Sequence, residues 1–408
     1  MGQFNRQLNA EREYDTLSKE YSEKLAERGF IDAFVELREH EEVGEYHHIK
    51  VTINWDELPD NLIVHLEPGV LQNLVEEATR KAGSVPALEK ELSIQHSNIY
   101  KIRKGRDTIS IGILKSLLDY LKIPRKKMNE HIVGIGGKRK PDQIIKPRLP
   151  FDFNSEEGAI VIAAALKDGS LCESDRTHAF LYANRDKESI KRVKEAIEKV
   201  FGKCIPRERN MGNAKEIRYD SVVIVEALKS IGIPTGEKVR HLYHVPEVIR
   251  EGNEDVMRAY LYQTMMDEGS WSYEGKFVSY SQAVALNDKV LSEKEKEYLD
   301  ELLVDKRCPP SGSTIYYTRV TGDLEEEVRK ECPHLWEVME ESKPSFFEEE
   351  AEMIEKLCGV RPKLEPTQIY KTEGGEYRVL WTMSIRRKDD IGQIIKELGL
   401  PEKKHPEG

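Results

Sequence analysis

The stretch "AYLYQTMMDEGSW" (residues 259–271) is an apolar helical run that ends in two adjacent acids, a glycine, a serine and a large apolar residue. A similar stretch, "GAIVIAAALKDGSL" (residues 158–171), stands earlier in the chain. It also passes from an apolar run to an acid, Gly-Ser and a large apolar residue. This recurrence indicates two copies of one structural unit.

The segments that follow each of these stretches also repeat in the same order. The helix-prone "DKESIKRVKEAIEKVFG" (residues 186–202) is matched by "FFEEEAEMIEKLCG" (residues 346–359). Likewise "EIRYDSVVIVEALKSIGIP" (residues 216–234) is matched by "EYRVLWTMSIRRKDDIGQIIKELGLP" (residues 376–401). Helix-strand-helix units in tandem predict a pseudo-twofold α+β body.

We place the boundary between the two copies in the segment before the second acid-ended run. Repeat 1 is predicted to span residues 151–255 and repeat 2 residues 256–408. The second copy is longer because it carries an insert near residues 306–345, which includes the acidic stretch "GDLEEEVRKE".

Residues 151–400 resemble a two-repeat LAGLIDADG homing endonuclease. The two motifs match as "VIAAALKDG" (residues 161–169) and "LYQTMMDEG" (residues 261–269). The resemblance implies pseudo-twofold αββαββα repeats, in which the two motif helices pack side by side and the β-sheets form a saddle. It also implies that the acid before the final glycine of each motif lies at the base of this saddle.

This resemblance implies that Asp168 and Glu268 are catalytic acids that bind Mg²⁺, and it places Lys238 at a basic position that orients the hydrolytic water. Two converging carboxylates repel each other and need a hard cation between them. Metal ions held there would stabilise the attacking and leaving oxygens during phosphodiester cleavage. If the chain is an active nuclease, Mg²⁺ is therefore its cofactor.

Two residues depart from the family pattern. Leu166 stands where the first motif often has a second acid, and Gln263 stands where the second motif usually has a small residue. A bulky amide at a close helix crossing is expected to push the two helices apart, unless residues 163–165 opposite make room. We therefore predict that the two acids are too far apart or too misaligned to share a metal ion, and that the chain does not cleave nucleic acid.

Residues 67–125 are predicted to form an all-α domain of short helices. The segment "ALEKELSIQHSNIYKIRKGRDTISIGILKSLLDYLKI" (residues 87–123) resembles the Cro/C1-type helix-turn-helix of phage repressors. Its recognition helix would span about residues 95–104, with three isoleucines facing inward: Ile94, Ile99 and Ile102. Gln and Asn can read base edges, and Lys and Arg can contact phosphates. The predicted nucleic-acid contacts are therefore Gln95, His96, Asn98, Lys101, Arg103, Lys104 and Arg106.

Residues 126–150 are predicted to be a basic linker. The stretch "VGIGGKRKPDQ" (residues 133–143) has glycines that make it pliable, and the prolines of this segment disfavour a helix. Three adjacent cations of the linker are further predicted nucleic-acid contacts: Lys138, Arg139 and Lys140.

The charge is unevenly distributed along the chain. The net charge is -11, yet residues 101–150 carry 14 Lys and Arg against 4 Asp and Glu, whereas residues 251–408 carry a net -12. Local patches set contact potentials, so overall acidity does not exclude a nucleic-acid partner.

Residues 1–66 are predicted to be a small α+β unit for docking or homodimerisation. The alternating segments "HIKVTINW" and "NLIVHL", joined by "DELPD", predict a short hairpin. No apolar run is long enough for a membrane span, and no signal segment is visible, so we expect a cytoplasmic protein without a membrane partner or a small-molecule substrate.

These features predict a nucleic-acid-binding factor built on a non-cleaving homing-endonuclease scaffold. Its target is DNA or a structured RNA, including a ribosomal particle, because the family also contains RNA-binding intron maturases. Two alternatives stay open at this point. The chain is an active Mg²⁺-dependent site-specific endonuclease, or it is a dimeric assembly factor that bridges large ribonucleoprotein partners.

Overall fold

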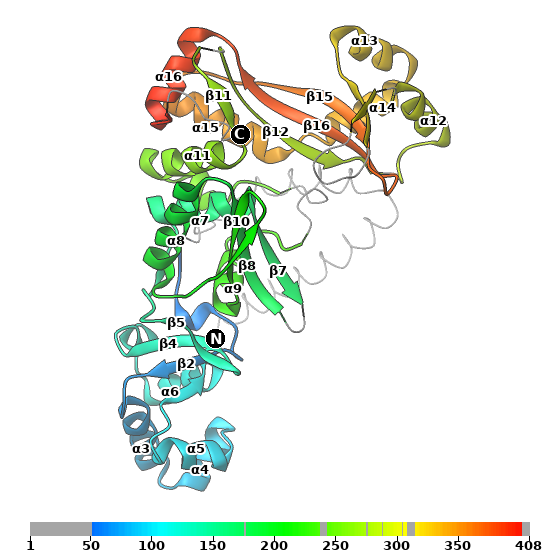
Figure 1. The fold of residues 1–408 in the computed structure, drawn as a ribbon. Coiled ribbons are helices and arrows are strands. Elements are labelled where there is room, and N and C mark those ends of the chain that lie inside the picture. Colours follow the sequence, from blue (N-terminus) through cyan, green and yellow to red (C-terminus); the bar gives the residue numbers. More distant parts are fainter. Residues whose placement is uncertain are drawn as a thin grey trace, which may run out of the picture. The chain divides into compact units, whose positions relative to one another are not determined.

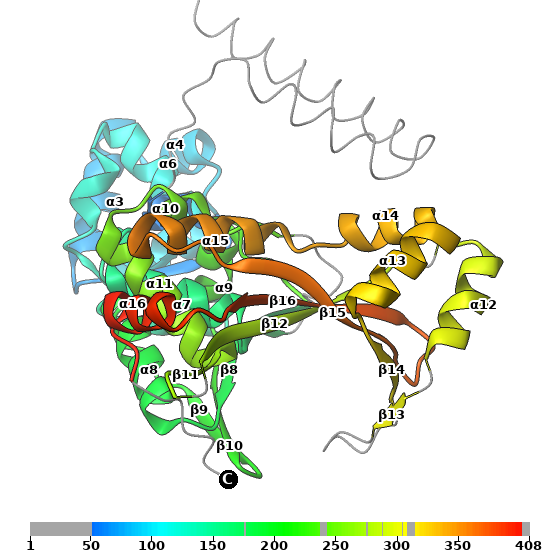
Figure 2. The same ribbon diagram turned by 90° about the horizontal axis from the view of Figure 1, so that it is seen from above.

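The structure is a computed structural model of the 408-residue chain (Figures 1 and 2). It describes residues 51–174, 177–236, 243–274, 276–287, 289–303, 305–307 and 315–401. Residues 50–408 form one compact unit, and the predicted docking role of the segment before it lies outside the described residues. Within the described part of the chain, no helix is both long and apolar enough to cross a membrane.

A four-stranded antiparallel sheet frames the predicted helix-turn-helix region. Its strand order is β3-β2-β4-β5. Val64 on the central strand β2 pairs with Ile109 on one side and with Ile135 on the other, and all three side chains are buried. The four strands are β2 (Ile63–Leu66), β3 (Thr108–Ser110), β4 (Ile132–Gly137) and β5 (Lys140–Ile145).

Four helices pack beside this sheet: α3 (Val70–Ala82), α4 (Val85–Leu92), α5 (His96–Arg103) and α6 (Ile111–Leu121). Helix α4 begins at Ser84, whose hydroxyl accepts the backbone N–H of Ala87. It ends at Ser93, which adopts the left-handed conformation (φ 51°) and turns the chain into α5. The predicted inward-facing side chains Ile94, Ile99 and Ile102 are buried.

The prediction that residues 126–150 form a linker is wrong for most of the segment. Strands β4 and β5 form a hairpin whose tip is the turn at Lys138 and Arg139. The glycines that indicated pliability instead allow close strand packing. A Cβ on Gly136 would lie 2.3 Å from the carbonyl oxygen of Lys140, which is closer than real Cβ contacts allow.

The predicted hairpin of residues 48–66 is also wrong in its pairing, and the domain that follows is not all-α. Strand β1 (Thr52–Ile53) pairs with β6 (Phe151–Asp152), whereas β2 pairs with β3 and β4. Between β1 and β2 the chain forms a short 3₁₀ helix, Trp55–Glu57, which buries Trp55. The turn residues therefore lead the two strands to different partners.

Two units with the same order of elements follow, which confirms the predicted αββαββα repeats. Repeat 1 has a four-stranded sheet of order β7-β8-β10-β9, and repeat 2 has a larger sheet. The elements of repeat 1 are α7 (Glu156–Leu166), β7 (Gly169–Ser174), β8 (Thr177–Asn184), α8 (Lys187–Phe201), β9 (Arg207–Met211), β10 (Ala214–Tyr219) and α9 (Val222–Lys229). After α10 (Glu247–Arg250), those of repeat 2 are α11 (Glu254–Glu268), β11 (Ser270–Ser272), β12 (Phe277–Ala285), α15 (Ser345–Cys358), β15 (Lys363–Lys371), β16 (Tyr377–Ile385) and α16 (Lys388–Leu398).

The predicted insert in repeat 2 extends the sheet as well as adding helices. The six-stranded order is β11-β12-β16-β15-β14-β13, so β14 pairs with β15 and lengthens the sheet at its edge. The insert runs from the end of β12 to the start of α15, and its elements are α12 (Glu293–Leu302), β13 (Asp305–Arg307), β14 (Ile315–Arg319), α13 (Gly322–Glu331) and α14 (Pro333–Glu341).

The motif helices α7 and α11 pack against each other at the junction of the two repeats (Figures 1 and 2). Three adjacent alanines of α7, residues 163–165, are buried there. The glycine after each helix is sterically required, because a Cβ on Gly169 would lie 2.4 Å from the Ala164 carbonyl oxygen and one on Gly269 would lie 2.5 Å from that of Met265. The glycines therefore let each strand leave its helix in a sharp turn.

Candidate nucleic-acid interface and acidic centre

Most of the predicted nucleic-acid contacts between residues 95 and 106 are exposed, either on α5 or close to its ends. Asn98 is half-buried, and its side-chain oxygen accepts a long hydrogen bond of 3.5 Å from Arg106. His96 contacts the Glu89 carboxylate on α4. The exposed members of the predicted set are Gln95, His96, Lys101, Arg103, Lys104 and Arg106.

Tyr100 is a candidate contact on α5 that sequence reasoning missed. Its side chain is 58% exposed, and the Lys104 ammonium lies 5.7 Å from the ring centroid. Tyr100 stands four residues after His96 and three before Arg103, so the three side chains share one helix face. That spacing was a usable signal, because exposed aromatic rings beside cations stack on bases.

The cations at the tip of the β4–β5 hairpin, Lys138, Arg139 and Lys140, are exposed. They line a groove of about 580 Å³ that lies between the hairpin and the sheet of repeat 1. Arg207 and Arg218 line the same groove from repeat 1. The structure thus brings the predicted hairpin cations together with two arginines that the sequence did not single out.

Strand β9 is exposed along its whole length, and its arginines lie on one face of the sheet of repeat 1. Arg207 pairs in register with Arg218 on β10, and Arg209 pairs with Glu216. Asp220 contacts both Arg207, at 3.1 Å, and Arg218, at 2.7 Å. One carboxylate between two guanidinium groups leaves this part of the sheet net positive.

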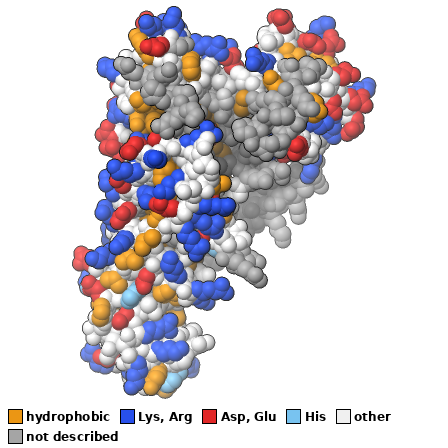
Figure 3. All heavy atoms as spheres, in the orientation of Figure 1, with side chains coloured by type: hydrophobic (Ala, Val, Ile, Leu, Met, Phe, Trp, Pro, Cys, Tyr) orange, Lys and Arg blue, Asp and Glu red, His pale blue; other side chains and the backbone are white. Residues whose placement is uncertain are grey.

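Figure 3 displays the same uneven distribution of charge on one face of the molecule. Lys and Arg side chains are spread over the part that carries repeat 1, and Asp and Glu side chains gather over the insert helices of repeat 2. The net charge of -12 over residues 251–408 therefore includes the acids of the insert helices, and it is not the charge of the sheet of repeat 2 alone. On the side of β16 away from its buried core residues lie Arg378, Leu380 and Thr382, which include no acid.

An acidic centre lies at the junction of α7 and α11, and one amide joins its two carboxylates. The side-chain nitrogen of Asn184, at the end of β8, donates to Asp168 at 2.8 Å and to Asp267 at 3.2 Å. The Asn184 side-chain oxygen accepts the backbone N–H of Asp186 at 2.9 Å, which sets the orientation of the amide. The sequence paired Asp168 with Glu268, whereas the hydrogen bonds join Asp168 with Asp267.

Gln263 and Tyr182 complete this network around Asp267. The Gln263 side chain is fully buried and donates to Asp267 at 2.8 Å and to the Tyr182 oxygen at 3.2 Å. Tyr182 donates to Asp267 at 2.6 Å, and burial together with the Asp267 charge raises the pKa of Tyr182 well above its usual value. The amide predicted to separate the motif helices is thus buried and hydrogen-bonded to α11 itself and to β8 of repeat 1.

Arg192 links the same network to repeat 1 from α8. Its guanidinium donates to the Gln263 side-chain oxygen at 3.3 Å and to the Tyr262 hydroxyl at 3.2 Å, and it lies 4.6 Å from the centroid of the Tyr262 ring. Both ends of the Gln263 amide are thus satisfied across the junction, which is what burial of an amide requires.

Lys167, the residue before Asp168, forms a fully buried ion pair with Glu350 on α15. The ammonium lies 2.8 Å from the carboxylate, and neither side chain is exposed to solvent. Tyr260 donates to the same carboxylate oxygen at 2.7 Å, and the Lys167 ammonium lies 4.0 Å from the centroid of the Phe346 ring. Burial raises the pKa of Glu350, and the nearby charge of Glu268 acts in the same direction.

A Mg²⁺ ion bound between Asp168 and Asp267 would have to replace hydrogen-bond donors that occupy one oxygen of each carboxylate. Magnesium takes oxygen ligands in a strict octahedral arrangement. Here Asn184 donates to Oδ2 of Asp168, and Asn184, Gln263 and Tyr182 all donate to Oδ1 of Asp267. These neutral donors stabilise the two carboxylates by hydrogen bonding. The third predicted catalytic residue, Lys238, lies outside the described residues.

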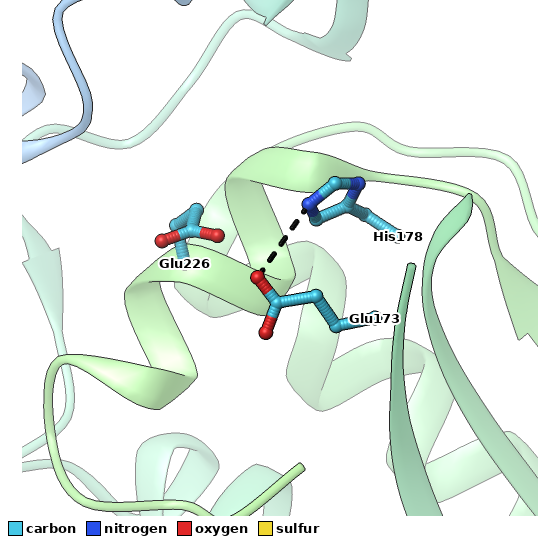
Figure 4. A group of neighbouring side chains, drawn as sticks. All are labelled: Glu173, His178 and Glu226. Atoms are coloured by element: carbon cyan, nitrogen blue, oxygen red, sulfur yellow. Dashed lines mark ion pairs between the residues drawn. The ribbon is translucent and has the colours of Figure 1, made fainter. Parts of the chain in front are cut away.

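Another group of potential metal ligands lies on repeat 1, where Glu173, His178 and Glu226 come together (Figure 4). The His178 ring nitrogen is 3.8 Å from the Glu173 carboxylate. The ammonium of Lys229 contacts Glu173 at 2.8 Å and Glu226 at 3.3 Å. This lysine supplies the positive charge that a cation would otherwise provide, so the group is accounted for by ion pairing.

Comparisons with known proteins find likenesses in structure but not in sequence. No protein-family model and no curated protein matches the sequence. A solved structure of a mesophilic variant of the homing endonuclease I-DmoI covers 61% of this chain and 98% of its own, at 12% identity and a TM-score of 0.30. I-DmoI in complex with DNA and Mn covers 62% and 99%, at 11% identity and a TM-score of 0.31. The N-terminal LAGLIDADG domain of DUF199/WhiA covers 64% and 88%, at 8% identity and a TM-score of 0.29.

Proposed function

We propose that this chain is a nucleic-acid-binding factor that does not cleave its target. The observation that carries the proposal is the set of exposed polar side chains on α5 and at its two ends, which follows directly after the tight turn at Ser93: Gln95, His96, Lys101, Arg103 and Lys104. A short helix followed by a tight turn can place a second helix, with its exposed polar side chains, in a groove of a duplex. In this proposal α4 and α5 form a helix-turn-helix and α5 is the recognition helix.

Charge supports the same function. Residues 101–150 carry a net charge of +10, and the cations at the end of α5 and at the hairpin tip are exposed. Contacts between such cations and phosphates release counterions, which makes affinity depend steeply on salt. Gln95 and Asn98 add amides that can read base edges.

The acidic centre supports the proposed absence of cleavage. Asn184 donates to both Asp168 and Asp267, so a metal ion placed between these two oxygens would have to displace it. We therefore expect no cleavage of DNA in Mg²⁺ or Mn²⁺. Specific double-strand cuts that disappear in Asp168→Asn or Glu268→Gln would instead establish an active endonuclease. If no cuts appear, both variants should leave the affinity nearly unchanged.

The binding experiment compares two variants with equal changes in charge. In the first, Lys101, Arg103, Lys104 and Arg106 are replaced by Ala. In the control, four exposed lysines on the helices of repeat 2 are replaced by Ala: Lys294, Lys330, Lys356 and Lys396. The first variant should bind more weakly. For a DNA duplex, its plot of log affinity against log salt should flatten by about 0.9 for each phosphate that the protein no longer neutralises.

The same assay decides the class of target. Duplex DNA, structured RNA and purified ribosomal subunits are offered to the unmodified chain, and the chain purified from its native host is examined for bound DNA or RNA. Equal behaviour of the α5 variant and the control on every target would contradict the proposal. A larger decrease in affinity of the α5 variant for one target would identify that target.

A further inference from the structure

Two grooves of the structure meet at one lysine. The first lies between the hairpin tip and the sheet of repeat 1 and is lined by Lys138, Arg207 and Arg218, among others. The second lies beside α5, where Asn98 and Arg106 line it. Lys138 lines both grooves. The hairpin tip therefore stands where the surface of α5 continues into the surface of repeat 1.

The hairpin is attached to both neighbours, so its tip is held in place. Toward the first sheet, Asp142 contacts the His65 ring nitrogen at 2.9 Å. Toward repeat 1, the Gln143 side-chain oxygen accepts the backbone N–H of Val222 at 3.1 Å. Ile145 and Lys203 exchange backbone hydrogen bonds of 2.8 and 3.0 Å. A tip anchored on both sides costs little ordering entropy when a ligand binds to it.

The charges along this path have one sign for most of its length. Arg106 lies at the α5 end, Lys138 and Arg139 at the hairpin tip, and Arg207 and Arg218 at the end on repeat 1. Asp220 is the acid that lines the first groove, and it is engaged by both arginines of repeat 1. A continuous run of cations with few acids fits an extended polyanion better than a compact anion.

We propose that a single continuous nucleic acid occupies both grooves and passes over Lys138, so that the hairpin couples α5 to the sheet of repeat 1. This inference rests on the proposed function and adds that the two surfaces bind one molecule and not two. The ligand is recognised along this path through its phosphate backbone, which DNA and RNA duplexes share. The test therefore uses both kinds of duplex.

The test varies the length of the probe and the charge of the hairpin in the full chain. Short duplexes of about 10 base pairs, one helical turn, can fill one groove, whereas duplexes of about 30 base pairs can span both. The hairpin variant is Lys138→Ala with Arg139→Ala. Its matched control is Lys126→Ala with Lys127→Ala, two exposed lysines of the same basic segment that line neither groove.

We expect one long duplex to bind per chain, with an affinity about tenfold lower in the hairpin variant and changed by no more than about twofold in the control. On the long probe the salt slope should fall by about 1.8, the value for two phosphates that are no longer neutralised. Two further variants, one in each groove, test whether both grooves bind the same molecule. A variant of the groove beside α5 (Asn98→Ala, Arg106→Ala) and a variant of the groove on repeat 1 (Arg207→Ala, Arg218→Ala) should both weaken binding of the same long duplex, but not of the same short one.

Two outcomes would overturn the inference, and they differ in what they mean for the function. If the chain binds nucleic acid, but two long duplexes bind per chain or the hairpin variant behaves like its control, the coupling is absent and the proposed function stands. If the unmodified chain binds no duplex of either kind at low salt, the proposed function fails and the inference fails with it.

Discussion

At the scale of single residues, the acidic centre is defined by its hydrogen-bond donors. Asp267, which precedes the predicted acid, accepts hydrogen bonds from Asn184, Gln263 and Tyr182. A carboxylate that accepts several hydrogen bonds is stabilised when it is partly buried. We therefore expect Asp168 and Asp267 to contribute to the stability of the fold, whether or not the chain cleaves nucleic acid.

Replacing Gln263 by Ala should destabilise the fold by about 1–3 kcal/mol, because it removes one donor from Asp267 and deprives the guanidinium of Arg192 of an acceptor. Urea denaturation measures the change. The control is Gln393→Ala on the exposed side of α16, which should stay within about 0.5 kcal/mol. An equal effect of both variants would show that the network adds no stability.

A second prediction at this scale concerns Asp186, which caps α8. Its carboxylate accepts the backbone N–H groups of Glu188 and Ser189. Burial of the carboxyl acts to raise its pKa, but the hydrogen bonds from Ser189 and Glu188 outweigh burial, and the pKa of Asp186 is lowered. Asp186→Ala should therefore cost about 1 kcal/mol near neutral pH.

The sign of the pH dependence follows from that lowered pKa. The stability that ionised Asp186 contributes is present above the unfolded pKa of about 3.9 and is lost as the pH falls through the folded value. The difference in unfolding free energy between the parent and Asp186→Ala should thus shrink on acidification. Asp186→Ser, which caps without an ionisable group, should show a difference from Asp186→Ala that stays constant with pH.

At the scale of elements, the β4–β5 hairpin shows how the same residues can indicate opposite structures. Glycine and proline usually mark turns and loops, and the stretch of residues 133–143 contains three glycines and one proline. Here the strand pairing with β2 and the contact of Asp142 with His65 require close backbone approach, which only glycine permits. The segment is therefore an ordered part of the fold.

Gly136→Ala tests this interpretation. The added Cβ would meet the carbonyl oxygen of Lys140 at 2.3 Å, so the hairpin must shift, at a cost of about 1–3 kcal/mol. Thermal unfolding monitors the decrease in stability. In Gly322→Ala, at the start of α13, the Cβ meets no atom within 4 Å, and this control should keep or slightly raise stability. A linker would tolerate both changes equally.

At the scale of the molecule, side chains from one repeat are satisfied by the other. The buried pair of Lys167 and Glu350 joins the end of α7 to α15, and Arg192 reaches from α8 to α11. Such polar links make the two repeats depend on each other for their stability. The pair of Lys167 and Glu350 also places buried charges close to Asp168, and removal of either partner would leave the other charge buried and unpaired.

Lys167→Met should destabilise the fold by about 3–5 kcal/mol, because it leaves Glu350 buried without its cation. Adding Glu350→Leu should recover most of this stability, since an apolar pair replaces an ion pair at little net cost. Chemical denaturation of both variants gives the coupling. The exposed pair Lys199–Glu157 provides the comparison, and Lys199→Ala should cost no more than about 1 kcal/mol. Absence of recovery in the double variant would contradict the explanation.

The sequence by itself determined that the chain holds two tandem repeats of helices and strands, and it determined the inward face of α5. Both depend on patterns that are local in the chain: the recurrence of two acid-ended apolar runs, and isoleucines spaced to line one side of a helix. Such patterns can be recognised in the sequence because the periods of helices and strands relate residues that are close together in the chain. The positions of Asp168 and Glu268 at the ends of the two motif helices were predictable for the same reason.

Only the tertiary structure decided which acids share a hydrogen-bond donor and which strands of the first sheet pair with each other. Asn184 and Asp267 are 83 residues apart, and His65 and Asp142 are 77 apart, so no local pattern announces either contact. Hydrogen bonds and strand pairing over such separations depend on how whole elements pack. For that reason the sequence could place an acid at the end of each motif helix, but only the packed structure shows that Asn184 joins Asp168 to Asp267.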